Sequence, residues 1–251
     1  MKSKGLFFLC FFLLSIFSGA SQTHKVHSHN DYEQDIPFWK ALSAGVSSLE
    51  ADVFLRDGQL MVAHEAENLQ ADRTLERLYL KPLAETLQLG FLSDKSLQLL
   101  IDIKSEAYTT LDAVVGLLKE YPMITGNNKI SIVISGNRPK TSAYVNYPDF
   151  ISFDYQSLEP VEDLKALDKI ELISLSFRKF SRWDGKGKLP DDDLERIMAV
   201  VRTAHAMGKP FRFWATPDSK MAWQALVDMG VDYVNTDHPI ECVQYVNSLP
   251  K

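Results

Sequence analysis

The sequence predicts an α/β protein, a single (β/α)8 barrel of the TIM type with a small hairpin inserted after the second strand. Apolar or β-branched runs alternate with amphipathic stretches in eight successive units. The 251 residues show no internal repeat and no break in composition, and one barrel commonly fills this length. A doubly wound open sheet is the alternative fold, but no GxGxxG motif follows the first strand, so a dinucleotide site is unsupported.

Each of the eight units pairs one expected strand with one expected helix. The strands are expected at residues 25–29, 47–53, 97–103, 129–135, 150–154, 170–177, 209–214 and 231–235. The helices are expected at residues 36–44, 82–89, 108–121, 140–145, 158–167, 191–207, 219–229 and 239–246. After the second strand, Arg56-Asp57-Gly58 separates two apolar runs, which predicts a hairpin that returns the chain towards the strand end.

The first twenty residues have the order of a secretory signal, with Lys2 and Lys4, an apolar run over 6–17 and the small residues 18–20. We therefore expect residues 1–20 to be a signal peptide and residues 21–251 to form one domain of a secreted or periplasmic protein. A single-pass anchor is the less favoured alternative, because the apolar run is shorter than the roughly 20 residues that span a bilayer. No stable membrane anchor is expected after the signal is removed.

The charge and the cysteine content exclude several classes of partner and fold. The net charge is -6 and there is no basic run, which argues against a nucleic-acid partner. Removal of the signal would leave Cys242 as a single cysteine, so no internal disulfide is expected.

Three acidic residues predict a metal site. Glu50 and Asp52 lie two apart in the second expected strand, so their side chains project from the same face. Two like charges so close together favour a cation between them, and Mg²⁺ and Ca²⁺ prefer oxygen ligands. Asp102 ends the third strand and would lie at the same end of a barrel. The predicted cofactor is therefore a divalent metal, Mg²⁺ or Ca²⁺, because zinc would require more His or Cys.

Further polar residues follow the carboxyl ends of the expected strands, where barrel enzymes carry their active sites. Lys104 shares a face with Asp102, and an ammonium beside a metal site implies a further anion, for which phosphate is the obvious candidate. Asn30, Trp214 and Asn235 are expected to contact the substrate from neighbouring strand ends. By default Trp214 packs in the core or in the pocket wall, and a lid over the ligand is the secondary interpretation.

Two histidines could transfer protons at this site. His29 and His64 arrive from different elements and could act as base and acid, since an imidazole with a pKa near about 6.5 can take or give a proton at neutral pH. His27 shares a strand face with His29, so the spacing leaves open which of the two is the base. The loop at residues 179–189 is expected to cover the active face and to influence substrate choice.

Taken together, the segments HSHNDY, SLEADVFLRDGQLMVAH, LLIDIK, FWAT and VDYVNTDHP resemble the PLC-like phosphodiesterase superfamily. This superfamily includes the glycerophosphodiester phosphodiesterases, the sphingomyelinase D relatives and the group named after the yeast altered inheritance of mitochondria protein, which the chain resembles most. The resemblance implies a (β/α)8 barrel. It also implies His29 and His64 as the acid/base pair, a metal on Glu50, Asp52 and Asp102, and phosphate contact by Lys104.

The expected function is a secreted, metal-dependent phosphoric diester hydrolase that acts on a small-molecule or lipid-headgroup phosphodiester. Either water or a hydroxyl of the substrate could attack the phosphorus, and the two routes give direct hydrolysis or a cyclic phosphate. The alternative from another class is a non-catalytic barrel that binds a phosphorylated or sugar ligand without turnover.

Overall fold

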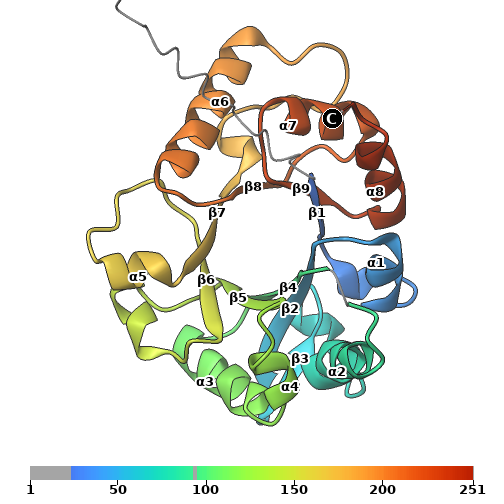
Figure 1. Cartoon of the computed structure of the whole chain (residues 1–251), viewed down its shortest axis with the longest axis vertical. Helices are drawn as coiled ribbons and strands as arrows, with labels where there is room; N and C mark the ends of the chain where they lie inside the picture. Colours follow the sequence, from blue (N-terminus) through green and yellow to red (C-terminus); the bar gives the residue numbers. More distant parts are fainter. Residues whose placement is uncertain (1–23, 93–94, 251) are drawn as a thin grey trace, which may run out of the picture.

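Eight parallel strands form a closed barrel surrounded by helices, which confirms the predicted fold class (Figure 1). A computed structural model describes residues 24–92 and 95–250, so the predicted signal peptide lies outside the described residues. The barrel strands are β1 (Lys25–Ser28), β2 (Ser48–Arg56), β4 (Leu97–Ile103), β5 (Ile130–Gly136), β6 (Ile151–Tyr155), β7 (Ile170–Ser176), β8 (Phe211–Trp214) and β9 (Tyr233–Thr236). Pairing runs from β1 through β9 back to β2, and β1 pairs with β2 to close the ring.

The outer layer consists of short and medium-length helices. They are α1 (Trp39–Ala44), α2 (Lys81–Gln88), α3 (Ala107–Leu118), α4 (Pro122–Thr125), α5 (Leu164–Asp168), α6 (Asp191–Ala206), α7 (Lys220–Asp228) and α8 (Pro239–Asn247). Short 3-10 turns lie at Asp31–Glu33, Ala66–Asn68, Thr141–Asn146 and Phe177–Lys179, and a π turn at Glu76–Leu80 precedes α2. Within the described residues, no helix has both the length and the apolar character that a membrane span requires.

Two helices begin three or more residues later than the sequence predicts, and each has a proline near its expected start. Pro160 lies inside the helix expected over 158–167, and α5 begins only at Leu164. Pro37 lies in the helix expected over 36–44, and Phe38 takes a φ of 65°, so α1 begins at Trp39. Proline disfavours helical backbone in the residue before it, which shortens a helix at its start. The helix expected over 140–145 is the 3-10 turn Thr141–Asn146.

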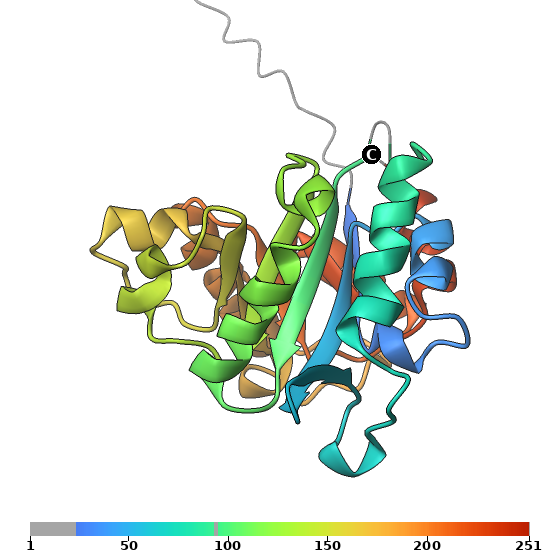
Figure 2. The same cartoon turned by 90° about the horizontal axis from the view of Figure 1, so that it is seen from below.

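The hairpin after the second strand is formed by β2 and β3 (Gln59–Val62), paired antiparallel from Val53↔Val62 to Arg56↔Gln59. Asp57 and Gly58 make its turn with φ angles of 49° and 76°, as a two-residue hairpin with left-handed backbone requires. Figure 2 shows that the hairpin and the chain after it project beyond the barrel at the end towards which β2 and β4 point. This end carries the candidate site.

The interior of the barrel changes from apolar to polar along the strands. Leu100, Val133 and Leu172 form a fully buried apolar cluster. Because strand side chains repeat every two residues, the next inward positions on these strands are Asp102, Ser135 and Ser174. The apolar layer therefore supports a polar layer at the carboxyl end of the barrel.

Candidate active site

Three carboxylates meet at the carboxyl ends of β2 and β4. Glu50 and Asp52 lie on β2, and the parallel register sets Asp52 beside Asp102 of β4. One oxygen atom from each of the three residues lies within 4.8 Å of the others. Glu50 and Asp52 are almost fully buried. The period-two pattern that predicted this cluster therefore does bring these side chains together.

The charges of the three carboxylates repel one another. Burial, together with the charge of Glu50, raises the pKa of Asp52 to about 7 and the pKa of Asp102 to about 6. Burial alone would also raise the pKa of Glu50, but the nearby His29, His27 and Arg212 hold it well below its ordinary value. The cluster thus has the capacity to take up additional positive charge.

The residues present fit a hard divalent cation. All three candidate ligands offer oxygen atoms, which Mg²⁺ and Ca²⁺ prefer. Oδ1 of Asp52 is buried and has no hydrogen-bond partner within the described residues. An unpaired buried carboxylate oxygen is costly unless a cation or donor approaches it.

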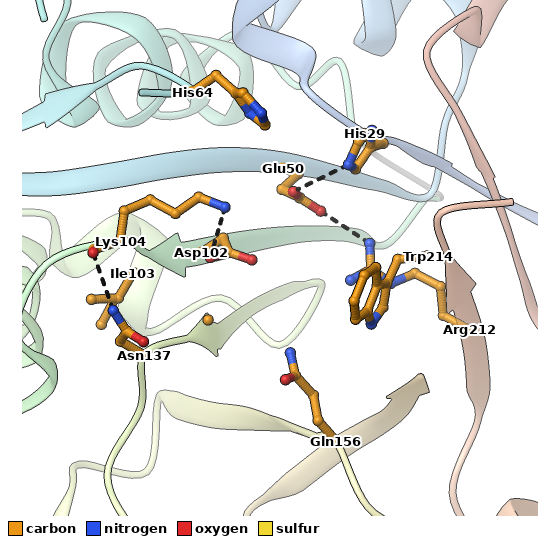
Figure 3. Close-up of a pocket in the computed structure, with 11 residues that line it drawn as sticks. His29, Glu50, His64, Asp102, Ile103, Lys104, Asn137, Gln156, Arg212 and Trp214 are labelled. Carbon is orange, nitrogen blue, oxygen red and sulfur yellow. Dashed lines mark hydrogen bonds and ion pairs between the residues drawn. The ribbon is translucent and has the colours of Figure 1, made fainter. Parts of the chain in front are cut away.

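Lys104 lies directly beside the cluster, at the end of β4. Its Nζ is 3.0 Å from Oδ2 of Asp52 and 3.3 Å from Oδ1 of Asp102 (Figure 3 draws the contact with Asp102). Burial lowers the pKa of Lys104, but the two aspartates outweigh this and raise it above its ordinary value. Lys104 is therefore a fixed positive charge next to the carboxylates, suited to an anionic group of a ligand.

His29 follows β1 and lines the cavity (Figure 3). Its backbone N–H donates to the carbonyl of Thr236, Nδ1 lies 2.7 Å from Oδ1 of Asp237, and Nε2 lies 4.0 Å from Oε1 of Glu50. Burial lowers the pKa of this imidazole, whereas Glu50 and Asp237 raise it, and the net shift is upward. With Nδ1 held by Asp237, Nε2 is the nitrogen available for chemistry.

His64 reaches the same cluster from the other side, because the hairpin turns the chain back after β3. Its Nδ1 lies 3.4 Å from Oδ2 of Asp52 and 3.1 Å from the hydroxyl of Tyr32. The side chain is 52% exposed, so it lies at the mouth of the cavity and not on its floor. Figure 3 shows His29 and His64 among the residues that line the cavity, and it draws the contact of His29 with Glu50.

His27 has a different environment from His29. It is fully buried, and burial followed by the charge of Arg212 lowers its pKa to about 3, so the ring is neutral. Nε2 lies 2.8 Å from Oε2 of Glu50 and 2.5 Å from Nη1 of Arg212, and Nδ1 lies 2.7 Å from the Ser48 hydroxyl. Both ring nitrogens are thus occupied, and His27 has none left for a substrate.

The cavity at this end of the barrel has a volume of about 400 Å³. It is lined by His29, Glu50, His64, Asp102, Ile103, Lys104, Gly136, Asn137, Gln156, Arg212 and Trp214. Trp214 ends β8 and is 36% exposed, so it forms part of the cavity wall. Arg212 contacts Glu50 and Asn137 contacts the backbone of Lys104, and Figure 3 shows Gln156 and Trp214 on the side of the cavity away from His64.

Asn30 and Asn235, which the sequence suggested as substrate contacts, are not among the cavity-lining residues. Asn30 has a φ of 47° and its Oδ1 lies 2.8 Å from the Tyr32 hydroxyl. Asn235 is buried, and its Oδ1 accepts a hydrogen bond from Arg212 at 3.2 Å. Both asparagines hold other site residues in place.

The loop over 179–189 also lies elsewhere than expected, since none of its residues lines this cavity. Trp183 is buried, and its indole N–H donates to the carbonyl of Lys186 within the loop. Gly185 packs against Pro217 and Ala222, at the start of α7. The loop therefore covers α7, because its aromatic and glycine residues pack there.

Several site residues were missed by reasoning from the sequence, above all Arg212. Its Nη1 is 3.0 Å from Oε2 of Glu50, and the residue is almost fully buried. A detectable signal was present, since Arg212 lies between two phenylalanines in a strand and two residues before Trp214, on the same face. Tyr32 was missed as well: its hydroxyl donates to Asp52 at 2.7 Å, a contact between distant elements that no local pattern shows.

Two phosphodiesterase families match parts of this chain. Residues 16–92 match the AIM6-like phosphodiesterase domain, and residues 210–240 match the glycerophosphoryl diester phosphodiesterase family. The predicted resemblance to the PLC-like phosphodiesterases is confirmed. The first match contains Glu50, Asp52 and both proposed proton-transfer histidines, and the second contains Arg212 and Trp214.

Two relatives of this chain are named after altered inheritance of mitochondria protein 6. The chain is 28% identical to altered inheritance of mitochondria protein 6 of Eremothecium gossypii, over 85% of this chain and 67% of that protein. It is 29% identical to the homolog from Arthroderma benhamiae, over 84% of this chain and 80% of that protein.

Solved structures of PLC-like phosphodiesterases share the fold. A glycerophosphodiester phosphodiesterase from Parabacteroides distasonis has a TM-score of 0.60 and 16% identity, over 90% of this chain and 98% of that one. A Ca²⁺-dependent phosphatidylinositol-specific phospholipase C from Streptomyces antibioticus has a TM-score of 0.58 and 10% identity, over 89% of this chain and 96% of that one. At these identities the likeness concerns the fold.

Proposed function

We propose that this chain is a secreted or periplasmic, divalent-metal-dependent phosphoric diester hydrolase that acts on a glycerophosphodiester or a phospholipid headgroup. One observation carries the proposal: three clustered carboxylates, Lys104 and two histidines lie together at the carboxyl end of a barrel related to phosphodiesterases. A phosphodiester needs charge neutralisation on its oxygens and two proton transfers, and this set of groups can supply both.

Glu50, Asp52 and Asp102 would hold the metal, as Mg²⁺ or Ca²⁺. When bound, such an ion supplies Lewis-acid stabilisation of negative charge on the phosphoryl oxygens. Lys104 adds a second positive charge on the same side of the cavity. Arg212 holds Oε2 of Glu50, so that this carboxylate keeps its orientation and its negative charge.

His29 is suited to remove a proton from the attacking hydroxyl or water. Asp237 holds its Nδ1, and a carboxylate in that position orients the ring and raises its basicity. His64 lies at the exposed mouth, where a leaving alcohol departs, and is suited to protonate it. Trp214 and Gln156 on the opposite wall would contact the organic part of the substrate.

The decisive experiment is an assay with glycerophosphodiesters, phospholipids and bis(4-nitrophenyl) phosphate, each with Mg²⁺, with Ca²⁺ and with excess chelator. We expect hydrolysis that depends on one of the two metals and stops on chelation. Turnover that persists at the same rate in chelator would remove the metal from the proposal. Binding of these compounds without turnover under any condition would favour a non-catalytic barrel.

A further inference from the structure

Asp218 lies outside the cavity, in the turn between β8 and α7, yet both of its carboxylate oxygens are used. Oδ1 accepts a hydrogen bond from the indole N–H of Trp223 at 2.6 Å, and Oδ2 accepts one from the backbone N–H of Asp237 at 2.7 Å. Trp223 lies on α7 and is 3% exposed. Asp218 therefore fastens the chain after β9 to a buried side chain of a helix.

Asp237 is held from its other side as well. Nε2 of Gln34, in the loop after β1, donates to the Asp237 carbonyl at 2.8 Å. The backbone of Asp237 is thus held by a hydrogen bond at its N–H and by another at its C=O, and we call these two bonds the Asp237 clamp. Its side chain is 53% exposed, and an exposed carboxylate ordinarily samples several rotamers, so the fixed backbone is what keeps Oδ1 at 2.7 Å from Nδ1 of His29.

The turn that carries Asp218 is itself tightly constrained. Ala215 has a φ of 54°, in the left-handed region that residues other than glycine rarely adopt. A Cβ on Gly185 would approach Cβ of Pro217 to 2.8 Å, so the loop after β7 presses against this turn. Ser219 then begins α7 by accepting from the backbone N–H of Ala222. Such strain persists only where the surrounding structure enforces it.

We propose that Asp218 is a positioning residue that sets the orientation of His29 through Asp237. This inference rests on the proposed function for its effect on catalysis, but its structural part does not. Asp218 would act as Gln34 does, by fixing the backbone of Asp237, and it would touch neither substrate nor metal. Partners that orient a functional side chain in this way typically contribute about 10- to 100-fold.

The test compares Asp218→Asn with Asp228→Asn. In Asp218→Asn the new amide would turn its NH₂ group towards either the Trp223 indole or the Asp237 N–H, both of which are donors, so one of the two bonds is lost. Asp228 lies at the exposed end of α7, is bound only to Gln224 among the hydrogen bonds described, and makes the matched control. Proton NMR of the His29 Nδ1–H, which a bond to a carboxylate shifts downfield, provides a measurement that needs no turnover.

For Asp218→Asn we expect a weakened or faster-exchanging His29 resonance and a kcat about 10-fold lower with little change in KM, the signature of a defect in the chemical step. Asp228→Asn should leave both unchanged. An unaltered resonance and kcat in Asp218→Asn, with only a lower melting temperature, would overturn the proposal. If the wild-type protein were inactive on every phosphodiester, the proposed function would be wrong. The His29 resonance would still test whether Asp218 fixes the position of Asp237.

Gln34→Ala tests the same clamp from the exposed side, where folding is not at risk. It removes the bond to the Asp237 carbonyl and leaves Asp218 and Trp223 in place. We expect a change in the His29 resonance in the same direction and of smaller size. If Asp218→Asn does not fold, an unchanged resonance in Gln34→Ala overturns the proposal.

Discussion

Nζ of Lys104 lies 3.0 Å from Oδ2 of Asp52, so the ammonium already engages one oxygen of the carboxylate whose other oxygen, within the described part of the chain, is buried without a partner. The two oxygens of Asp52 therefore have different roles available to them. Oδ2 is neutralised by the protein, whereas Oδ1 is buried and has no hydrogen-bond partner among the described residues. This difference makes Asp52 the most informative position at which to test metal binding.

Asp52→Asn should weaken binding of Mg²⁺ and Ca²⁺ by at least about 10-fold, because even residues that only orient metal ligands contribute that much. Titration calorimetry with each metal measures the affinity directly. Asp57→Asn is the matched control, since Asp57 lies in the hairpin turn with a φ of 49°, a conformation that Asn tolerates. Full affinity in Asp52→Asn would remove this residue from the site.

His29→Asn and His64→Asn should each reduce the rate by about 10²- to 10⁴-fold, the usual contribution of a positioned acid or base. The double variant should lose less than the product of the two single losses, because residues that act as one unit are not additive. A remote histidine on α6 provides the control, in His205→Asn. If both single variants kept the wild-type rate, the proposed hydrolase activity of this site would be contradicted.

The roles of the two histidines separate by leaving group. A 4-nitrophenyl phosphodiester needs little protonation of its leaving group, so it should largely rescue His64→Asn and should not rescue His29→Asn. The ratio of kcat/KM for the activated and the unactivated substrate is the quantity to measure. If the activated substrate rescued His29→Asn and not His64→Asn, His29 would be the acid and His64 the base.

His27→Asn should reduce stability more than it affects chemistry. The substitution removes the partner that the buried Glu50 carboxylate and the Ser48 hydroxyl share, while Arg212 and Gln98 remain, at a cost of about 1–3 kcal/mol for the two lost hydrogen bonds. Urea denaturation measures this loss, with His29→Asn as the comparison. A stable but inactive His27→Asn, beside an active His29→Asn, would show that the base is His27.

Gly136→Ala should damage both stability and metal binding. Gly136 has a φ of 67°, and a Cβ there would overlap Oδ1 of Asp102 and lie 2.5 Å from the carbonyl oxygen of Ile103. Gly58→Ala is the control, because its φ is 76° with no atom within 4 Å of the added carbon. Both variants place alanine in left-handed backbone, which costs about 1–2 kcal/mol of stability. Only a larger loss of stability in Gly136→Ala than in Gly58→Ala would therefore support the predicted overlap with Asp102 and Ile103.

Without metal, stability should fall as the pH rises from about 4.5 to about 7. The pKa of Asp52 is raised to about 7 and that of Asp102 to about 6, so the folded state binds more protons than the unfolded state in this window and loses stability as they are released. His27 opposes part of this fall below about pH 6.5, because its pKa is lowered to about 3 in the folded state and its contribution to stability therefore rises with pH. The lowered pKa of Glu50 acts only at lower pH, where its contribution is lost.

The size of this pH effect is on the order of a few kcal/mol, since one pKa unit corresponds to about 1.4 kcal/mol. Urea midpoints at pH 4.5 and pH 7, with and without Mg²⁺ or Ca²⁺, measure it. Added metal should restore stability at pH 7 and have little effect at pH 4.5. A midpoint that rises with pH in chelator would contradict the raised pKa values.

The sequence predicted the barrel and much of the site because both depend on periodicity. Glu50 and Asp52 lie on one face of β2, and the turn at Asp57 brings His64 back to them, as local patterns indicate. Arg212 was missed because a single cation in an apolar strand is ambiguous without the fold. Tyr32 was missed because its hydroxyl reaches Asp52 across twenty residues.

The prediction that the loop over 179–189 covers the cavity was wrong for a related reason. Its length and its place after β7 suggested a cover for the cavity, but packing decides where a loop lies. Trp183 is buried and Gly185 allows close contact with Pro217, neither of which spacing can show. The same contacts give the loop an indirect relation to the site, through the turn that carries Asp218.

His29 and its partner Asp237 are separated by 208 positions, because β1, the first strand of the barrel, pairs with β9, the last one. A chain is synthesised from its N-terminus, so His29 emerges from the ribosome long before β9 exists to pair with β1. Contacts of such long sequence separation form late in folding. A nascent chain would therefore carry all three carboxylates and both histidines while still lacking the oriented imidazole, and the proposed hydrolase would become active only once β9 and Asp237 had been synthesised and had packed against β1.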